Sequence, residues 1–369
     1  KVLNVPNLRF PEFEGEWEKC KLGDACNVFM CKRILATQTN TEGGVPFYKI
    51  RTIGGTPDAY ISKELFDDYK TKYNYPHKGE VMITCAGTVG KCVIYDGKDA
   101  YYQDSNIVWI DNPSQYIGNG FLYHLLANVD WRKLNSTTII RIYNDDLRNL
   151  KLSYPQIEEQ KKISRLLSLL DERISTQNKI IDKLQSLIKG IRNDVFGKLR
   201  KSVGFNAMIG DVLSYEQPQS YLVEDTEYTN EGTPVLTANK AFVLGYTSEI
   251  EGIYDKGDCI IFDDFTLDCK YVDFSFKVKS SAIKILTAKN KELLRYTFEF
   301  LKYLDLSTEE HKRHYITETQ NQEFILPTVQ IVRTIAHAFY ALSLWKETIV
   351  KQRYAFEKQK QYLLRQMFI

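Results

Sequence analysis

Residues 154–196 read YPQIEEQKKISRLLSLLDERISTQNKIIDKLQSLIKGIRNDVF, and this stretch decides how the 369-residue chain is organised. It aligns without a gap with residues 326–368, LPTVQIVRTIAHAFYALSLWKETIVKQRYAFEKQKQYLLRQMF, at an offset of 172 residues. Pro155 then falls on Pro327. A segment of this length that recurs at a fixed offset indicates a tandem duplication, in which each copy forms one structural unit.

Apolar residues in the first copy recur at alternating steps of four and three residues, interrupted only by Gln177. This heptad spacing is typical of a long helix with a continuous apolar seam. The second copy places Lys346, Arg353 and Lys360 at seam positions, where long stems reach water more easily from a two-helix seam than from a closed core. We therefore expect the two helices to pair with each other, although two ordinary core helices of one domain are the alternative. The expected seam comprises Ile163, Leu167, Leu170, Ile174, Ile181, Leu184, Ile188, Ile191, Leu342, Ile349, Phe356 and Leu363.

The segments before the two helices contain short runs of β-branched and aromatic residues bounded by glycine, proline or aspartate, which predict strands. These runs are residues 45–53, 80–87, 91–97 and 105–110 in the first half and 258–265, 270–278 and 281–286 in the second. Each half also has one helical stretch, at residues 119–128 and 290–304. The predicted fold class is α+β, with two strand-rich mixed globular domains joined by two long coiled-coil helices. The expected boundaries are residues 1–154, 155–204, 205–326 and 327–369.

The formal net charge of the chain is only +2, but the charge is unevenly distributed. Residues 1–154 carry +1, residues 155–204 carry +5, residues 205–326 carry −9 and residues 327–369 carry +5. Bulk charge therefore argues neither for nor against nucleic acid as a partner. A local basic face in the folded chain would be needed to attract it.

Several classes of protein are disfavoured by the composition. No stretch approaches the ~20 consecutive apolar residues of a membrane span, and residues 1–20 lack the layout of a secretory signal, so we expect a cytoplasmic protein. The seven cysteines form no C-x-x-C pair, which predicts reduced thiols. A zinc site built from Cys20, Cys26 and Cys31 with a remote histidine would need irregular spacing, so no metal site is predicted.

Motifs for catalysis are also missing from the sequence. Residues 86–92, AGTVGKC, have two residues between their glycines where a phosphate-binding loop needs four, so a hairpin turn is the better interpretation. Asp263 and Asp264 could act as acid and base, but adjacent carboxylates at strand ends are more often solvated or bonded to backbone. No H-E-x-x-H pair, G-x-S-x-G elbow or Asn-Pro-Pro-aromatic methyltransferase loop occurs. We therefore predict no catalytic residues.

Loops that mix cations, small hydroxyls and amides are the remaining candidates for function. Arginine and lysine pair with guanine edges, asparagine pairs with adenine, and hydroxyl groups hold phosphates. Lys49 and Arg51 belong to one apparent strand, and Lys312 with Arg313 form the expected basic face of the acidic second domain. The candidate DNA-binding residues are Lys49, Arg51, Lys91, Asn106, Ser136, Thr137, Thr138, Arg141, Asn239, Lys240, Tyr246, Lys312, Arg313, His314 and Tyr315.

Two stretches of the chain match a known family. Residues 8–24, LRFPEFEGEWEKCKLGD, and residues 149–174, NLKLSYPQIEEQKKISRLLSLLDERI, resemble the specificity subunit of type I restriction-modification systems. In the second copy Ile331-Val332 and Ser343 replace Glu159-Gln160 and Asp171, so the resemblance does not imply family contacts through those positions there. The resemblance covers nearly the whole chain. Its hallmark residues are Pro155, Glu159, Gln160, Ile163, Leu167, Leu170 and Asp171.

The resemblance implies that residues 1–154 and 205–326 are target-recognition domains, held apart by two antiparallel spacer helices. Each domain would read one half of a bipartite site in double-stranded DNA, with the helices setting the spacer between the halves. The family member is non-catalytic and binds no cofactor. It recruits two modification subunits, which methylate adenine with S-adenosylmethionine, and restriction subunits, which cleave DNA with ATP and Mg.

Two other functions remain open at the level of the sequence. A tandem coiled-coil scaffold that binds only proteins would show no salt-dependent affinity for DNA, whereas the affinity of a DNA-reading protein falls steeply with salt. A self-sufficient restriction or methyltransferase enzyme would need a cofactor or nuclease motif, which the sequence lacks.

Overall fold

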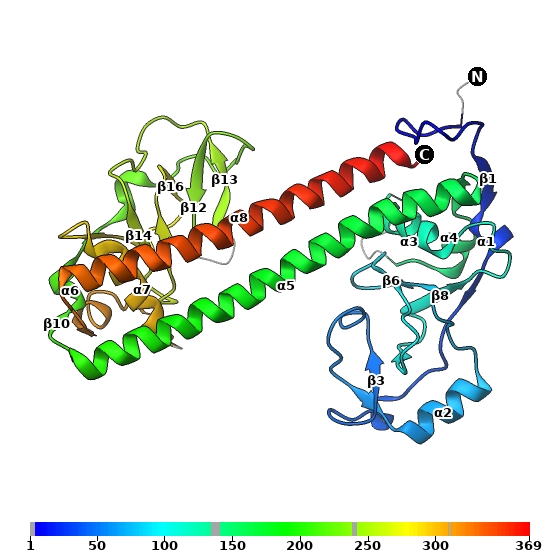
Figure 1. Ribbon diagram of the computed structural model, residues 1–369, viewed down its shortest axis with the longest axis horizontal. Coiled ribbons are helices and arrows are strands. Elements are labelled where there is room, and N and C mark those ends of the chain that lie inside the picture. The colour runs from blue at the N-terminus through cyan, green and yellow to red at the C-terminus, as the bar shows by residue number, and fades with distance from the viewer. Residues whose placement is uncertain (1–3, 134–140, 238–241, 309, 311) are drawn as a thin grey trace. The chain divides into compact units, whose positions relative to one another are not determined.

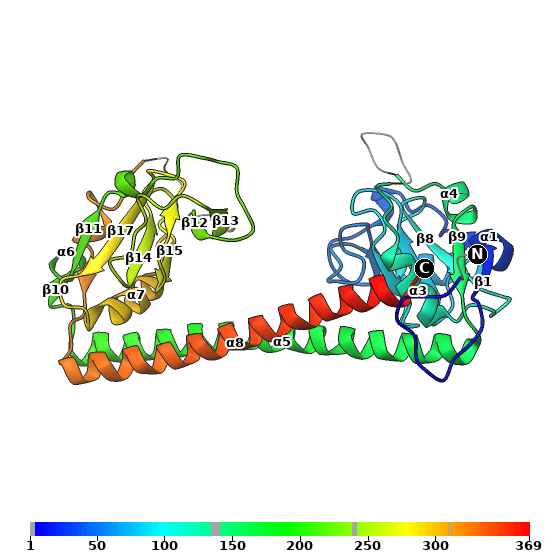
Figure 2. The same ribbon diagram turned by 90° about the horizontal axis from the view of Figure 1, so that it is seen from above.

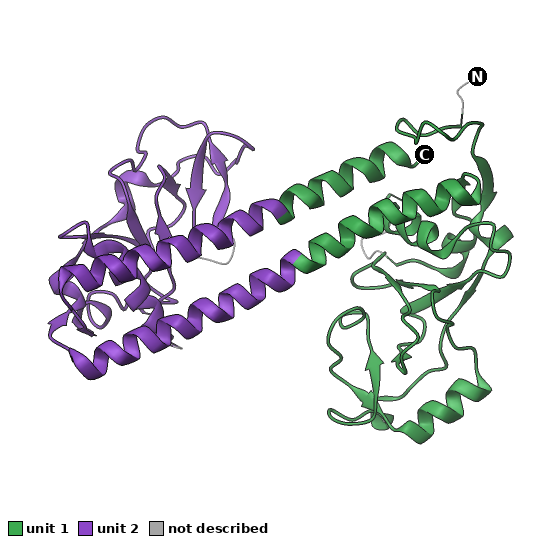
Figure 3. Cartoon of the chain, in the orientation of Figure 1, with its two compact units in different colours: residues 1–176, 353–369 green, residues 177–352 purple. Residues whose placement is uncertain are grey.

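The computed structural model of the chain describes residues 4–133, 141–237, 242–308, 310 and 312–369. The chain divides into two compact units, drawn in two colours in Figure 3. Unit 1 comprises residues 1–176 and 353–369, and unit 2 comprises residues 177–352. Each unit therefore contains one globular domain together with one part of each long helix.

Two long helices contribute to both units: α5, Ile157–Ser202, and α8, Val329–Met367. They begin 172 residues apart, which is the offset of the sequence repeat. Pro155 and Pro327 each lie two residues before a helix begins. A proline suits this place because it has no N–H group that would need a partner in the first turn.

The two helices run antiparallel within each unit and lie side by side in two perpendicular views (Figures 1 and 2). In unit 1 the start of α5 lies beside the end of α8, where Asp171 pairs with Lys360 at 2.5 Å. In unit 2 the end of α5 lies beside the start of α8, where Leu184 and Ile349 share a buried apolar cluster. The predicted fold class, two strand-rich mixed domains with long antiparallel helices, is confirmed.

The described residues of unit 1 form three sheets. A two-stranded antiparallel sheet pairs β1 (Glu18–Lys21) with β9 (Lys151–Tyr154). A four-stranded antiparallel sheet has the order β2 (Asn27–Phe29), β8 (Ile107–Asp111), β5 (Val81–Thr84), β6 (Cys92–Ile94). In the third sheet β3 pairs antiparallel with β4 and parallel with β7, in the order β4 (Tyr60–Ile61), β3 (Val45–Tyr48), β7 (Tyr101–Tyr102).

The described residues of unit 2 repeat these sheets with the same strand orders and directions. The two-stranded sheet pairs β10 (Ala207–Met208) with β18 (Glu323–Phe324). The four-stranded sheet has the order β11 (Leu213–Glu216), β17 (Ile283–Ala288), β14 (Cys259–Asp263), β15 (Cys269–Val272). The three-stranded sheet has the order β13 (Val243–Thr247), β12 (Thr233–Leu236), β16 (Lys277–Val278), and its β12–β16 pair is parallel. The duplication seen in the sequence is thus a duplication of topology.

Short helices complete both units. Those of unit 1 are α1 (Leu22–Ala25), η1 (Ala36–Gln38), α2 (Lys63–Lys72), α3 (Asn119–Asn128) and α4 (Asn144–Arg148). Those of unit 2 are α6 (Ile209–Val212), η2 (Pro218–Tyr221), α7 (Leu293–Leu304) and η3 (Thr319–Asn321). Helix α2 has no counterpart among the described residues of unit 2.

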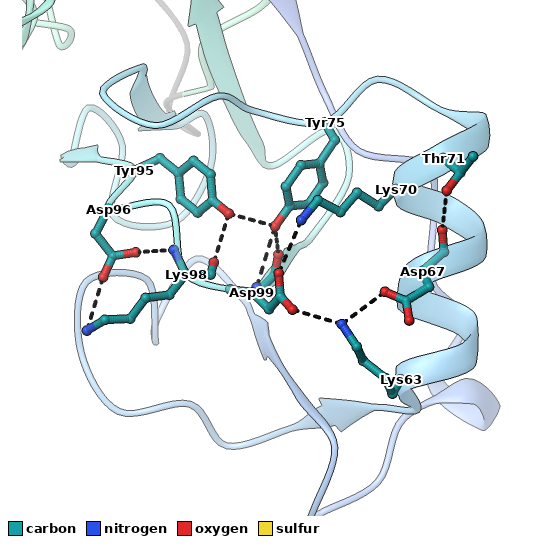
Figure 4. Close-up of polar contacts among 10 residues, drawn as sticks. Lys63, Asp67, Lys70, Thr71, Tyr75, Tyr95, Asp96, Lys98 and Asp99 are labelled. Carbon is teal, nitrogen blue, oxygen red and sulfur yellow. Dashed lines mark hydrogen bonds and ion pairs between the residues drawn. The ribbon is translucent and has the colours of Figure 1, made fainter.

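Polar contacts fix α2 to the loop that follows β6 (Figure 4). Lys63 and Lys70 both pair with Asp99, at 2.8 and 3.1 Å. Behind them the hydroxyl groups of Tyr75 and Tyr95 lie 2.9 Å apart. The exposed ion pairs add little stability by themselves, so the buried aromatic packing beneath them holds the helix.

Two predicted strands differ from the observed ones. The run at residues 45–53 is a strand only as far as Tyr48, because the Thr52 hydroxyl accepts the Lys49 N–H at 3.0 Å and closes a turn. Such side-chain bonds to backbone compete with strand pairing. Lys49 and Arg51 therefore lie in a turn and not in a strand. The run at residues 270–278 forms two strands, β15 and β16, that belong to different sheets.

Each four-stranded sheet is covered on both faces because successive side chains of a strand point to opposite sides. In β5, Val81 and Ile83 face the core formed with α3 and the long helices, whereas Met82 faces the three-stranded sheet. In β14, Ile260 faces α7 and the long helices, and Ile261 faces the other way. Figure 2 shows these layers in unit 2, with the sheet on α7 and α7 on the long helices.

The expected seam residues lie on the buried or half-buried side of both helices. Ile163 and Leu167 pack into the core of unit 1 as well as facing the helix pair. Ile181, Leu184 and Ile349 form a separate cluster between the helices in unit 2. The apolar seam therefore serves two contacts, one with the other helix and one with a globular domain.

His124 on α3 is buried against the long helices in unit 1, with 1% of its surface exposed. Its Nε2 atom lies 3.4 Å from the Ser168 hydroxyl, and its Nδ1 atom lies 4.0 Å from an Asp171 oxygen. Burial, together with the charge of Lys360, lowers the pKa of His124 to about 4, which Asp171 only partly opposes. The imidazole is therefore neutral at physiological pH.

Two leucines of α5 that lie two residues apart allow a direct test of the seam. Leu167 is fully buried and Leu169 is 38% exposed. Leu167→Ala should destabilise unit 1 by about 2–5 kcal/mol, whereas Leu169→Ala should cost less than about 1 kcal/mol. Urea unfolding of the full chain, followed by circular dichroism, measures both. Equal losses of stability would contradict the buried seam.

The pKa of His124 predicts a loss of stability in mild acid. Between the pKa of about 4 in the folded chain and about 6.5 in the unfolded chain, only the unfolded state binds the proton, so stability rises with pH in this window. Lowering the pH from about 7.5 to 5.5 should therefore cost about 1.3 kcal/mol through this residue. His124→Gln should remove that part of the pH dependence, and His77→Gln, at an exposed histidine, should retain it. Thermal unfolding at the two pH values makes the comparison.

Candidate nucleic-acid interface

The hairpin between β5 and β6 is the first element of the candidate interface. The Gly90 amide donates to the Thr84 carbonyl at 2.8 Å, and the Lys91 amide donates to the Thr84 hydroxyl at 3.0 Å. Gly90 has a φ of +82°, and a Cβ atom there would lie 2.2 Å from the Trp131 ring. Residues 86–92 therefore form the tight hairpin turn that the sequence predicts, and only glycine fits where the turn meets the tryptophan.

Backbone contacts bring three further loops against this hairpin. The Lys91 ammonium donates to the Ile53 carbonyl at 2.5 Å, which joins the hairpin to the turn that carries Lys49 and Arg51. The backbone amide of Cys85 donates to the Asn106 carbonyl at 2.8 Å, and the Cys85 carbonyl accepts the Ile142 amide at 2.9 Å. We call residues 49–55, 85–91, 104–106 and 141–142 together loop cluster 1. It contains Lys49, Arg51, Lys91, Asn106 and Arg141.

The side chains of loop cluster 1 differ in their availability. Arg51 and Lys91 belong to exposed residues, and Lys49 forms a surface ion pair with Asp58 at 3.0 Å. Such pairs are worth about 0–1 kcal/mol, so a phosphate or base edge could replace the carboxylate. Arg141 donates to the Ser105 carbonyl at 3.3 Å, which ties it to the same cluster.

Arg33 is a cation beside loop cluster 1 that the sequence did not predict. Its side chain is 65% exposed and its Nε atom lies 2.8 Å from Asp104, next to the loop of Asn106. The two residues are 71 positions apart in the sequence. No local motif marks this arginine, because its place depends on the packing of the loops.

Unit 2 holds an equivalent set of loops by the same backbone bonds. Asp264 donates its amide to the Ala282 carbonyl and accepts the His314 amide, each at 3.0 Å. These two bonds match those that Cys85 makes in unit 1. We call residues 264–268, 279–282 and 312–315 loop cluster 2. A cleft of about 510 Å³ opens beside it, lined by Thr237, Leu244, Asp263, Phe265, Thr266, Lys279, Ser280, Ala282 and Ile283.

Asp263 and Asp264 are structural groups in this arrangement. The Asp263 carboxylate accepts the amides of Phe265 and Thr266 at 2.8 and 3.1 Å. The Asp264 carboxylate is 1% exposed, accepts the amides of His314 and Tyr315 and lies 3.4 Å from the Lys284 ammonium. Both carboxylates are thus bonded to backbone, which is the alternative to catalysis that the sequence favours.

His314 and Tyr315 are not surface groups, which corrects their place among the predicted DNA-binding residues. Each is 1% exposed, because the backbone bonds to Asp264 hold the segment against the core. The His314 ring lies 2.8 Å from Glu318, and this hydrogen bond raises the pKa of the histidine. The Tyr315 ring packs against Tyr215 and Phe262 in the apolar core, and burial raises the pKa of its hydroxyl.

The expected basic face at Lys312 and Arg313 is weaker than the sequence suggests. Lys312 lies 2.6 Å from Glu310 and 2.9 Å from Glu318, so two carboxylates surround one ammonium and raise its pKa. Arg313 is exposed beside it. Tyr246 on β13 is 37% exposed and remains accessible. The other candidates, Ser136, Thr137, Thr138, Asn239 and Lys240, lie outside the described residues.

Other kinds of site are not found in the parts of the chain that the structure describes. No group of three or more histidine, cysteine or acidic side chains is arranged to hold a metal ion. The seven cysteines are unpaired, and burial raises the pKa of Cys26 and Cys31 to about 12, so these thiols are not activated nucleophiles. No helix described here has both the length and the hydropathy that a membrane span requires.

Two domains with the same sheet topology, each joined to a long helix and each holding three loop segments together by the same backbone bonds, define an internally duplicated protein. Residues 14–186 match the family model described as the type I restriction modification DNA specificity domain. Residues 14–186 therefore match the specificity domain of this family, and the chain is similar to type I restriction-modification specificity subunits.

Individual relatives carry the same description. The chain is 48% identical over 189 residues to a putative type I restriction enzyme specificity subunit, S.HindORF215P, of Haemophilus influenzae, which covers 51% of this chain and 46% of the relative. It is 45% identical over 126 residues to the EcoR124I/EcoR124II specificity subunit of Escherichia coli, which covers 32% and 31% of the two chains. The chain spans about half or less of the length of these curated relatives.

A solved structure shares the fold of the whole chain. The crystal structure of a type I restriction-modification S subunit from M. genitalium matches 99% of both chains with a TM-score of 0.69. The sequence identity is 16%, so this likeness concerns the fold alone.

Loop cluster 2 should depend on the buried charge of Asp264. Asp264→Asn leaves the fully buried Lys284 without its counter-charge, which should destabilise unit 2 by about 3–5 kcal/mol. Asp255→Asn, at an exposed carboxylate of the same unit, should change stability by less than about 0.5 kcal/mol. Hydrogen exchange of residues 312–318 and the urea midpoint of the full chain measure the effect. Unchanged protection of this segment in Asp264→Asn would contradict the anchoring role.

Proposed function

We propose that this chain is the DNA sequence-specificity subunit of a type I restriction-modification complex. Each globular domain reads one half of a bipartite site in double-stranded DNA. The observation that carries the proposal is that the same backbone bonds hold loop cluster 1 around Cys85 and loop cluster 2 around Asp264. Two equivalent surfaces on duplicated domains suit the reading of two half-sites by one chain.

The chemistry of the loop clusters fits DNA. Arg51 in cluster 1 and Arg313 in cluster 2 are exposed guanidinium groups that can pair with the O6 and N7 atoms of guanine. Lys49 and Lys91 supply further cations for phosphates, and Asn106 supplies an amide. The two clusters differ in sequence, so the two halves of the recognised site differ as well.

The long helices would set the spacer between the half-sites. Helix α5 has 46 residues, which corresponds to about 69 Å at 1.5 Å per residue. A helix whose seam is buried along its length is stiff enough to act as a ruler. This role concerns the nonspecific DNA between the two recognised halves.

Exposed apolar side chains on the helices suit the docking of modification subunits. A soluble chain does not normally leave many large apolar groups in water, so such groups mark contacts with partners. They include Leu169, Ile180 and Leu187 on α5 and Tyr340, Leu344, Trp345, Tyr354 and Tyr362 on α8. The modification subunits would bind S-adenosylmethionine, and restriction subunits would use ATP and Mg, while this chain remains non-catalytic.

Substitution of one arginine in each loop cluster tests the half-site proposal. Arg51→Ala and Arg313→Ala should each weaken recognition of a different half-site, by roughly 1–3 kcal/mol where the arginine reaches a base edge. Genome-wide mapping of methylated adenines, with modification subunits present, measures both effects. Arg148→Ala in unit 1 and Arg333→Ala in unit 2 are matched controls at exposed arginines outside the clusters.

Two outcomes would argue against the proposal. Identical changes at both half-sites would rule out one domain for one half-site. The full chain, assembled with its modification subunits, could also show no sequence preference and no salt dependence in DNA binding. That result would support a protein-binding scaffold instead.

A further inference from the structure

Residues 205–326 carry a charge of −9, yet in the proposed function this domain must approach DNA. Lys312 does not supply an uncompensated positive charge for DNA, because two carboxylates surround its ammonium group. A different concentration of cations lies in unit 2 where the domain meets the long helices. We call it the junction cluster, and it consists of Arg192, Lys270, Arg295, Lys302 and Lys346.

Four of these cations share two carboxylates. Asp268 lies 2.5 Å from Lys302 and 3.0 Å from Lys270. Glu299, which is 2% exposed, lies 2.7 Å from Arg192 and 3.3 Å from Arg295. Each carboxylate therefore balances only one of the two cations that it contacts.

Lys346 on α8 is the fifth cation and is half-buried. It has neither an ion pair nor a hydrogen bond with any described residue. Burial lowers its pKa, and so do the nearby charges of Lys270, Arg192 and Lys302. The five cations of the junction cluster and the two carboxylates that they contact together leave an excess of three positive charges.

The packing of α7 on α8 explains why these residues meet. Arg333 pairs with Glu292, and further along both helices Arg295 donates to the Ser343 hydroxyl, so α7 and α8 run in the same direction here. Lys346 lies three residues after Ser343 and therefore on the same face of α8. It consequently faces the end of α7, where Lys302 lies.

The junction cluster borders loop cluster 2. The carboxylate of Asp268 pairs with Lys302 and Lys270, and its backbone carbonyl accepts the Asp263 amide at 2.8 Å, which closes the β14–β15 hairpin. The cations thus begin where the proposed base-reading loop ends. An anion with several oxygens could contact more than one of them at once.

We propose that the junction cluster, with Lys346 at its centre, binds a backbone phosphate of the DNA beside the half-site that unit 2 reads. This inference rests on the proposed function and adds the electrostatic contact that the acidic domain otherwise lacks. An uncompensated, half-buried cation costs stability in the free protein, and a bound phosphate would offset that cost. Continuity with loop cluster 2 favours DNA over an acidic side chain of a partner protein.

The described residues of unit 1 do not share this feature. At the offset of 172 residues, Lys346 corresponds to Ile174, and Ser343 corresponds to Asp171, which pairs with Lys360. The first domain carries +1 and has exposed cations in its own loop cluster. The extra basic site is therefore found in the unit whose domain is acidic.

Lys346→Gln tests the proposal because it removes one positive charge without breaking an ion pair or a hydrogen bond to any described residue. DNA affinity of the full chain, assembled with its modification subunits, should fall roughly five- to tenfold for every duplex, specific or not. The slope of log affinity against log salt should become shallower by about 1 between about 50 and 200 mM salt. The methylated sequence should stay the same. Lys351→Gln, at an exposed lysine of α8 that pairs with Glu347, should change none of these values.

Stability separates this role from a structural one. Because Lys346 is repelled by its neighbours, Lys346→Gln should keep or raise the Tm of the full chain while DNA affinity falls. Lys270→Gln serves as a second variant and should show the same loss of affinity and salt slope. A lower Tm with unchanged DNA affinity would mean that Lys346 only supports the fold, and would overturn the inference.

Three further outcomes are distinguishable. If the wild-type complex discriminates its site and both variants bind DNA as the wild type does, the junction cluster does not contact DNA and the proposed function stands. If the variants fail to assemble with modification subunits but the free chain binds DNA normally, the cluster holds an acidic group of the partner, and the inference is wrong. If the wild-type complex shows no preference for any sequence, the proposed function itself fails.

Discussion

Burial of the apolar seam on α5 and α8 is the constraint on which the rest of the structure depends. A helix of 46 residues with an apolar stripe cannot remain alone in water, and one partner helix covers only part of that stripe. The remainder packs on the globular domains, as Leu167 does in unit 1 and Phe196 does in unit 2. Each domain is therefore fixed to the helices by apolar residues of the helices themselves.

A second feature of the structure is that the same backbone hydrogen bonds recur in both units, although the side chains at the matching positions differ. Cys85 in unit 1 and Asp264 in unit 2 hold the same three loop segments, one through its main chain alone and the other also through a buried carboxylate. The scaffold is thereby preserved while the exposed residues of the loops vary. Such a division suits a protein whose two domains would recognise different sequences on one topology.

Electrostatics distinguishes the two units. In unit 1, exposed cations occupy the loops themselves, whereas in unit 2 the loops are flanked by carboxylates and the excess of cations lies at the junction of α5, α7 and α8. The net charge of a segment is thus a poor guide to its surface, because it is the pairing of charges that decides where a field remains. Residues 205–326 have a net charge of −9, yet three of their cations form a basic cluster together with Arg192 and Lys346 of the long helices.

The sequence by itself determined the duplication, the helix pattern and the fold class, because the 172-residue offset and the heptad spacing are periodic signals that survive without contacts. It also identified the hairpin at residues 86–92, since glycine spacing is a local property. Tertiary structure alone decided which candidate residues face outward. His314 and Tyr315 have polar tips in a polar stretch, yet backbone bonds to Asp264, 50 and 51 residues away, bury them. The positions of Arg33 beside loop cluster 1 and of Lys346 in the junction cluster also depend on the tertiary structure, because each surface combines loops and helices that are far apart in the sequence.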